Sequence, residues 1–285
     1  MIEGWKTAMS VDICAFDIKT QHSLISVREI KEAEYVKAEI RGCESLEHAL
    51  NGADLVFSFV TADQTLLVAE SAAPYIKKGA IYFDCNSCAP QTKQRACKIL
   101  SENEAIYIDV AIMSPIHTLK HRTPMLISGL HSQKGADVFL QLNMIPTIVQ
   151  GDVGTASSIK MMRSIMVKGF EALLIECLLA ARKAGVEEQV FDSLEVSDPE
   201  IKWRRRMSYA LNRVTVHGER RAAEMREVLS MLHQLGIDGK MAKATTFWQQ
   251  TVGELKLKVH DKEYQQHADY IIQKLPEIEV KDYKL

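Results

Sequence analysis

The stretch GDVGTASSIKMMRSIMVKGFEALLIECLLAARKAG, residues 151–185, decides how the chain is organised. Apolar residues recur in it every three or four positions, which is typical of a helix with one buried face; they are Ile159, Met162, Met166, Phe170, Leu173, Leu174, Cys177 and Ala181. Gly154 precedes this pattern and Gly185 follows a basic last turn, as the rules for helix starts and stops expect. The stretch therefore predicts one helix over residues 155–184, long enough to connect two domains.

The residues before this helix predict a different structure from those after it. On the N-terminal side apolar runs alternate with helical segments, which indicates an α/β domain with a mainly parallel sheet covered on both faces. The predicted strands are residues 11–16, 35–40, 54–60, 80–83, 105–112, 125–128 and 145–149. Beyond the long helix only helical periodicity remains, with helices predicted at 187–195, 199–212, 218–235 and 239–257. We expect two domains, residues 1–150 and an all-α domain over residues 151–285.

Composition and charge narrow the classes of function. The chain has 285 residues, 47% of them hydrophobic, so it can bury one or two cores. Its 35 basic and 37 acidic residues leave a net charge of −2, which disfavours nucleic acid or an anionic membrane as a partner. Six cysteines without a preceding signal peptide favour a reduced, cytoplasmic protein. No apolar run approaches the roughly 20 residues that a membrane helix requires.

Polar residues follow several predicted strands, at the edge where parallel sheets bind ligands. The carboxylate of Asp17 can accept hydrogen bonds from an adenine ribose, or it is a solvated turn residue. Thr61 ends another strand. After the strand at 80–83 comes Asp-Cys-Asn-Ser-Cys-Ala-Pro, in which Asn86 and Ser87 can bind a carboxylate or a hydroxyl group at a helix start. The same segment can instead be a plain helix cap, or its Cys-x-x-Cys pair can be a redox or metal site.

Lys160 lies one turn into the long helix, close to Arg163. The positive end of a helix and a neighbouring cation both favour loss of the lysine proton. Such a lysine suits proton transfer to or from a hydroxyl or carbonyl oxygen. The alternative interpretation is an ordinary surface lysine.

A second charged cluster lies in the C-terminal part of the chain. His217, Arg220, Arg221 and Glu224 are spaced so that they share one helix face. Such a face can bind an anionic substrate, because a guanidinium pairs well with carboxylate or phosphate. It can equally be a solvated face with its own ion pairs.

These motifs, in this order, resemble the β-hydroxyacid dehydrogenases, the group that includes 3-hydroxyisobutyrate and 6-phosphogluconate dehydrogenases. DCNSCAP stands where the family has Asp-x-Ser-Thr-x-x-Pro, and GTASSIK stands where it has Gly-x-Gly followed by the catalytic lysine. The other matching segments are FDIKT, DLVFSFVT and YIDVAIMSPIHTLKHRTPMLISG. The resemblance covers residues 1–184 well. From HGERRAAEM onward the chain looks like a divergent subgroup with a distinct helical domain.

The resemblance implies a Rossmann-like doubly wound sheet and a helical substrate and dimerisation domain. It implies an NAD(P)-dependent oxidoreductase acting on a small hydroxy acid or its carbonyl counterpart, with Lys160 as general acid/base. The expected substrate-binding residues are Asn86, Ser87, Ser114, Thr123, His217 and Arg221, the last two holding the substrate's anionic part. The expected cofactor-binding residues are Asp17, Thr61 and Ser87, with Asp17 favouring NAD over NADP. The expected partners are a small anionic substrate and a second copy of the chain.

Relative to the family, the chain lacks the first strand of the sheet and the Gly-x-Gly-x-x-Gly loop that cradles a dinucleotide's pyrophosphate. Two interpretations follow. Either the true start lies upstream and the chain is a truncated enzyme, or the protein is a non-catalytic dimeric remnant that binds a metabolite or nothing. We favour the first.

Overall fold

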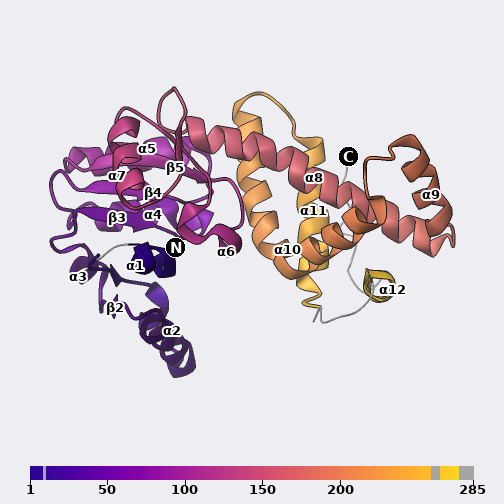
Figure 1. The fold of residues 1–285 in the computed structure, drawn as a ribbon, viewed down its shortest axis with the longest axis horizontal. Coiled ribbons are helices and arrows are strands. Elements are labelled where there is room, and N and C mark those ends of the chain that lie inside the picture. Colours follow the sequence, from indigo (N-terminus) through magenta and orange to yellow (C-terminus); the bar gives the residue numbers. More distant parts are fainter. Residues whose placement is uncertain (9–10, 258–263, 276–285) are drawn as a thin grey trace. The chain divides into compact units, whose positions relative to one another are not determined.

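The computed structural model describes residues 1–8, 11–257 and 264–275. The chain divides into two compact units, Met1–Lys160 and Met161–Leu285 (Figure 1). The division falls inside α8 (Thr155–Lys183), the long helix expected from residues 151–185. The domain boundary at residue 150 stays a prediction. In the described part of the chain, no helix is both long and apolar enough to cross a membrane.

A mainly parallel sheet organises the first unit. Its strands lie in the order β3 (Leu55–Ser58), β4 (Ile81–Asp84), β5 (Ile106–Ile112), β6 (Met125–Ser128) and β7 (Pro146–Ile148). Among these, β5 and β6 run antiparallel, and the other neighbouring pairs are parallel. Two further strands, β1 (Cys14–Ala15) and β2 (Arg41–Gly42), form a separate parallel pair. The predicted α/β class is confirmed.

Helices cover both faces of this sheet. One face packs with α1 (Ile2–Ala8) and α7 (Ser132–Gln141) in an apolar cluster that includes Trp5, Phe83, Ile108, Val110, Ile127 and Phe139. The other face carries Tyr82 and Tyr107, whose ring centroids are 5.9 Å apart, and packs with α4 (Thr65–Ala72) and α5 (Pro90–Glu102). Side chains alternate along a strand, so Asp84 and Asp109, two residues beyond these tyrosines, lie on the α5 face as well.

One predicted element of the first unit is wrong. The segment at 35–40 is not a strand, because α2 (Ile25–Ala38) continues through most of it. The sequence ISVREIKEAEYVKA is rich in good helix formers, and Glu39, with φ of 50°, ends the helix in the left-handed conformation. The other short elements are η1 (Ile18–Gln21), α3 (Leu46–Leu50), η2 (Ala62–Gln64), α6 (Ile116–Leu119) and η3 (Lys120–Arg122).

The second unit is helical throughout its described residues, as expected. After α8 come α9 (Glu187–Ser197), α10 (Trp203–Gln234), α11 (Lys240–Glu254) and α12 (Tyr264–Lys274). Their shared core includes Ile175, Leu178, Phe191, Met207, Leu211, Val214, Val252 and Ile271.

α10 is one helix, whereas the sequence predicts two, at 199–212 and 218–235. The helix continues through Gly218, which is buried. A Cβ atom at this position would lie 2.2 Å from the carbonyl oxygen of Gln249 and 2.7 Å from the Cα atom of Gly253, both on α11. Gly218 therefore lets two helix backbones touch and does not mark a helix start.

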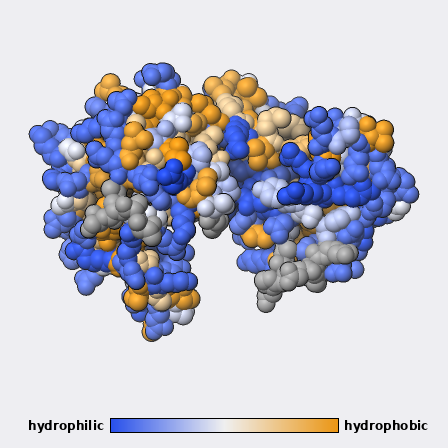
Figure 2. Space-filling view, in the orientation of Figure 1, coloured by the Kyte–Doolittle hydropathy of each residue, from blue (hydrophilic) through white to orange (hydrophobic). Residues whose placement is uncertain are grey.

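Part of the face of α8 that the sequence predicts as buried is exposed. Met162, Met166 and Leu173 are 38%, 73% and 55% exposed, whereas Ile175 and Leu178 are fully buried. α8 is apolar on more than one side, so the spacing of its apolar residues does not by itself select the core face. On the side of the molecule seen in Figure 2, hydrophobic residues reach the surface in both units.

Candidate active site

The segment after β4 is tied to the end of β3 by Asn86. The backbone N–H of Asn86 donates to Asp84 Oδ1 at 3.0 Å. Its side-chain Oδ1 accepts from the N–H of Val60 at 2.6 Å, and its Nδ2 donates to Ser58 Oγ at 2.9 Å. Asn86 is 3% exposed. Its amide thus organises the two strand ends, and its expected role as a substrate ligand stays a prediction.

Lys160 and Ser87 are brought into contact. Lys160 projects from the second turn of α8, and its Nζ donates to Ser87 Oγ at 2.5 Å. Both side chains are partly buried. Ser87 lies just beyond the C-terminal end of β4, which is the edge of a parallel sheet where ligands bind. Ser87 and Lys160 are predicted as site residues from separate parts of the sequence. In the structure they are hydrogen-bonded to each other.

Behind this pair lies a fully buried ionic cluster. Asp84 and Asp109 are opposite each other on β4 and β5, and both are 0% exposed. Lys93 of α5, also 0% exposed, places Nζ 2.8 Å from Asp84 Oδ1 and 3.6 Å from Asp109 Oδ1. Although burial lowers it, the pKa of Lys93 is raised above its ordinary value by the two carboxylates, so its ammonium stays charged. Tyr107 donates its hydroxyl to Asp84 Oδ2 at 2.5 Å.

Asp109 also holds the start of α8. Its Oδ2 accepts from the N–H groups of Gly154 at 3.0 Å and Ser157 at 3.2 Å, and from Ser128 Oγ at 2.9 Å. Its Oδ1 accepts from Ser157 Oγ at 2.6 Å. A carboxylate at the N-terminus of a helix satisfies amides that lack partners within the helix, and it is favoured by the helix dipole.

The residues expected from the sequence do not include this cluster, although the sequence contains a signal for it. Ala-Ile-Tyr-x-Asp occurs twice, at residues 80–84 and 105–109, and each copy ends on an acid. An acid that recurs at the same place in two buried strands indicates a shared partner, which here is Lys93.

Besides Ser87, the other two residues expected on the cofactor side also follow strand ends. Asp17 follows β1 and caps η1 by accepting from the N–H of Lys19 at 3.0 Å, and it pairs with Lys31 Nζ at 3.0 Å. Although partial burial raises it, the pKa of Asp17 is held below its ordinary value by these two contacts. Thr61, which is exposed, follows β3 and precedes η2.

Two residues of the expected substrate loop are placed differently from each other. Ser114 is exposed between β5 and α6. Thr123 is fully buried, and its hydroxyl donates to the carbonyl of Lys120 at 2.9 Å. Thr123 therefore shapes the turn that leads into β6, and its expected contact with substrate stays a prediction.

In the second unit, Arg221 is paired with neighbouring helices. It is 4% exposed, its guanidinium forms an ion pair with Glu171, and its Nε donates to Gln249 Oε1 at 3.2 Å. Its charge is therefore balanced inside the helical unit, and its expected contact with a substrate anion stays a prediction. His217, one turn earlier on α10, is partly buried.

The interpretation of Cys85 and Cys88 as a redox pair is not supported. They are 5% and 0% exposed. Burial raises the pKa of the Cys85 thiol to about 12, so the reactive thiolate is suppressed. Among the described residues, no group of three or more His, Cys, Asp or Glu side chains is placed to hold a metal ion.

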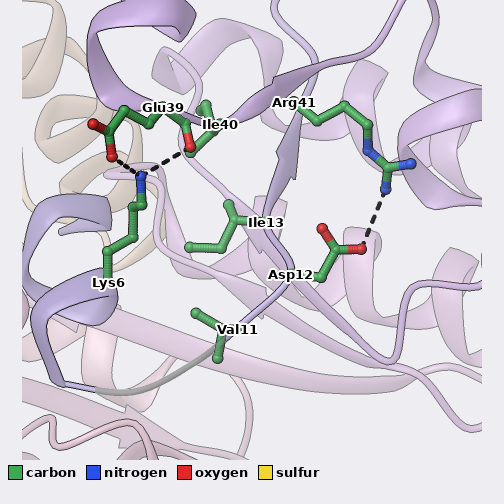
Figure 3. Close-up of a pocket in the computed structure, with 7 residues that line it drawn as sticks. All are labelled: Lys6, Val11, Asp12, Ile13, Glu39, Ile40 and Arg41. Carbon is green, nitrogen blue, oxygen red and sulfur yellow. Dashed lines mark hydrogen bonds and ion pairs between the residues drawn. The ribbon is translucent and has the colours of Figure 1, made fainter.

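A cavity of about 320 Å³ lies elsewhere in the first unit, at the amino ends of β1 and β2 (Figure 3). Its lining residues are Lys6, Val11, Asp12, Ile13, Glu39, Ile40 and Arg41. Lys6 reaches across it to Glu39 Oε2 at 2.6 Å, as Figure 3 shows. It shares no residue with the candidate site, which follows the carboxyl ends of the strands.

Two known families match different parts of the chain. Residues 14–131 match the NAD binding domain of 6-phosphogluconate dehydrogenase, and residues 181–252 match a domain of unknown function, DUF1932. An uncharacterised 28.5 kDa protein encoded in the 7S RNA 5′ region of Methanothermus fervidus is 28% identical over 199 residues, which are 69% of this chain and 74% of that protein.

Solved structures share the fold over nearly the whole chain. A conserved hypothetical protein from Sinorhizobium meliloti 1021 has a TM-score of 0.74 at 28% identity, covering 96% of this chain and 92% of that one. The 3-hydroxyisobutyrate dehydrogenase of Mycobacterium tuberculosis has a TM-score of 0.69 at 10% identity, covering 95% and 94%. The NAD-binding match and the dehydrogenase fold support NAD(P)-dependent oxidoreductase activity in general terms. The chain is thus similar to the β-hydroxyacid dehydrogenases in its NAD-binding match and its fold, and to DUF1932 in its helical part.

Proposed function

We propose that the protein is an NAD(P)-dependent oxidoreductase that interconverts a small hydroxy acid and its carbonyl counterpart, with Lys160 as the general acid/base. The observation that carries this proposal is the contact of 2.5 Å between Lys160 Nζ and Ser87 Oγ beyond the end of β4. A bound nicotinamide supplies or accepts the hydride at such a site.

The chain's own residues handle the proton. When the substrate is oxidised, Lys160 accepts the hydroxyl proton, and when the carbonyl is reduced, Lys160 returns it. The hydroxyl of Ser87 can both donate and accept, so it can orient the substrate oxygen while it keeps its hydrogen bond to Lys160. Ser114, exposed after β5, is proposed to contact the rest of a small anionic substrate.

The polar residues at the strand ends suit the ribose and nicotinamide parts of a dinucleotide, whereas this sequence contains no Gly-x-Gly-x-x-Gly loop for its pyrophosphate. The side chain of Asp17 is 34% exposed, so its carboxylate is accessible to ribose hydroxyls, and the hydroxyls of Thr61 and Ser87 follow β3 and β4. A carboxylate at this position repels the 2′-phosphate of NADP, which supports NAD as the proposed cofactor. Lys31 already neutralises part of the Asp17 charge, so the preference depends on that ion pair.

Titration of the purified chain tests this proposal. We expect saturable binding of NADH, seen as a shift in nicotinamide fluorescence, with weaker binding of NADPH. The substitution Asp17→Asn should reduce the difference between the affinities for NADH and NADPH, because it removes the charge that repels the 2′-phosphate. A positive titration is then followed by assays with small hydroxy acids. A folded chain that binds neither nucleotide and oxidises no hydroxy acid contradicts the proposal.

We also propose that the chain forms a homodimer through its helical unit. Met162, Met166 and Leu173 give α8 an exposed apolar stripe, and a second copy can cover it. Sedimentation analysis should give twice the monomer mass, and Met166→Glu should shift the chain towards the monomer. Val196→Glu is the matched control, because Val196 is 83% exposed on α9, outside this stripe. A wild-type chain that stays monomeric at all concentrations contradicts this proposal.

A further inference from the structure

We propose that Asp109 is a positioning residue, which sets the first turn of α8 so that Lys160 meets Ser87. This inference rests on the proposed function, because it concerns the same pair of side chains. Asp109 is 0% exposed, so it does not itself reach a substrate. Its influence on the reaction must pass through the groups that it holds.

The first group is the start of α8. Asp109 accepts hydrogen bonds from the N–H groups of Gly154 and Ser157 and from the hydroxyl of Ser157. Lys160 follows Ser157 by three residues, which is less than one helical turn. A rotation or shift of this first turn therefore moves Lys160 by a similar amount.

The second group is the segment that carries Ser87. Asp84, opposite Asp109, binds the N–H of Asn86, the residue before Ser87. Lys93 joins the two aspartates, because its Nζ lies 2.8 Å from Asp84 Oδ1 and 3.6 Å from Asp109 Oδ1. The segment with Ser87 and the helix with Lys160 are thus anchored to one buried ionic cluster.

The residues just before α8 also pack directly against α5, the helix that follows the Ser87 segment. Gly154, with φ of 102°, lies so close to the start of α5 that a Cβ atom on it would be 2.9 Å from Pro90 Cβ. Gln94 of α5 donates its side-chain Nε2 to the carbonyl of Val153 at 3.1 Å. Besides this packing, the first turn of α8 is held by Asp109 and by Ser128 Oγ, which accepts from the N–H of Ala156 at 3.0 Å and itself donates to Asp109.

The substitution Asp109→Asn tests the inference directly. Asparagine has nearly the same shape as aspartate but carries no charge. It has one side-chain acceptor oxygen, whereas Asp109 accepts hydrogen bonds through both of its carboxylate oxygens. Crystal structures of the unmodified chain and of the variant should show the contact between Lys160 Nζ and Ser87 Oγ only in the unmodified chain. In the assay, kcat should fall about 10- to 100-fold with little change in KM, as expected for a misplaced reacting group. An unchanged contact in the variant overturns the inference.

Two neighbouring serines provide a matched pair. Ser157→Ala removes the hydroxyl that binds Asp109, whereas Ser158→Ala removes a hydroxyl that binds only the carbonyl of Gly154 at 2.8 Å. We expect Ser157→Ala to lower kcat by about threefold to tenfold, and Ser158→Ala to change it by less than about twofold. Equal effects of the two substitutions overturn the inference. Because Ser157→Ala keeps the buried charges, this pair also decides the matter if Asp109→Asn does not fold.

A double-mutant cycle separates positioning from general stability. If Asp109 acts through the Lys160–Ser87 pair, Asp109→Asn should cost much less in kcat when Ser87 is already alanine. Equal costs in both backgrounds indicate a structural role only and overturn the inference. If the unmodified chain has no oxidoreductase activity, the proposed function fails, while the crystallographic contact in Asp109→Asn still decides whether Asp109 positions Lys160.

Discussion

Lys160→Met will leave the fold intact and lower kcat by about 10²–10⁴-fold, the usual contribution of a general acid/base. Methionine nearly matches the length of the lysine side chain, so the partly buried position stays filled. It cannot exchange a proton and cannot donate to Ser87 Oγ, the contact that Lys160 makes at 2.5 Å. Steady-state kinetics with the preferred nicotinamide measure the loss, and circular dichroism with thermal melting checks the fold.

The control for this substitution lies at the other end of the same helix. Lys183, in the last turn of α8, is exposed, so Lys183→Met changes the same side chain and the same charge without touching the candidate site. We expect it to retain the wild-type kcat. Turnover by Lys160→Met at the rate of Lys183→Met would remove Lys160 from the mechanism.

Local sequence signals predict the fold of the first unit well. The strands β3 to β7 are apolar runs of the right length for strands, separated by helical or polar segments. Such signals depend on near neighbours in the chain. They fail where a distant residue intervenes: Gly218 is predicted as a helix start, but it lies inside α10, where it allows close approach to Gly253 on another helix.

The candidate site shows the same limit. Ser87 and Lys160 are each predicted from their own surroundings, at a strand end and at a helix start. That they touch, across 73 residues, is a property of the fold. The sequence predicts Arg221 as an anion-binding residue because the spacing within α10 gives no information on its partner Glu171, which lies 50 residues away in the chain. Lys93 resembles a solvated helix lysine until two carboxylates are found opposite it.

Lys93→Met will destabilise the protein by about 3–5 kcal/mol, the cost of removing one partner from a buried ion pair. The unmodified cluster holds two negative charges and one positive charge, all without exposure to solvent. Without the ammonium, Asp84 and Asp109 face each other in register with nothing to offset their repulsion. Since domains are stable by about 5–15 kcal/mol in total, urea unfolding should show a much lower midpoint.

The loss should depend on pH in a direction that identifies its cause. Although burial lowers it, the pKa of Lys93 is raised by the two carboxylates, so the stability that its ammonium contributes is fully present below the ordinary lysine pKa and is lost as pH rises through the folded-state pKa. The deficit of the variant relative to the unmodified chain should therefore be the same at about pH 5 and about pH 8 and should shrink only in strongly alkaline solution. Lys98→Met, on the exposed side of α5, is the control and should stay within about 0.5 kcal/mol of the unmodified chain.

Removing one of the carboxylates as well distinguishes repulsion from lost packing. Lys93→Met combined with Asp109→Asn leaves a single buried carboxylate in place of two, so the double variant should regain part of the lost stability. If methionine destabilises only because it packs badly, the second substitution will add its own cost. A double variant less stable than Lys93→Met alone would contradict the assignment of Lys93 as the counter-charge for Asp84 and Asp109.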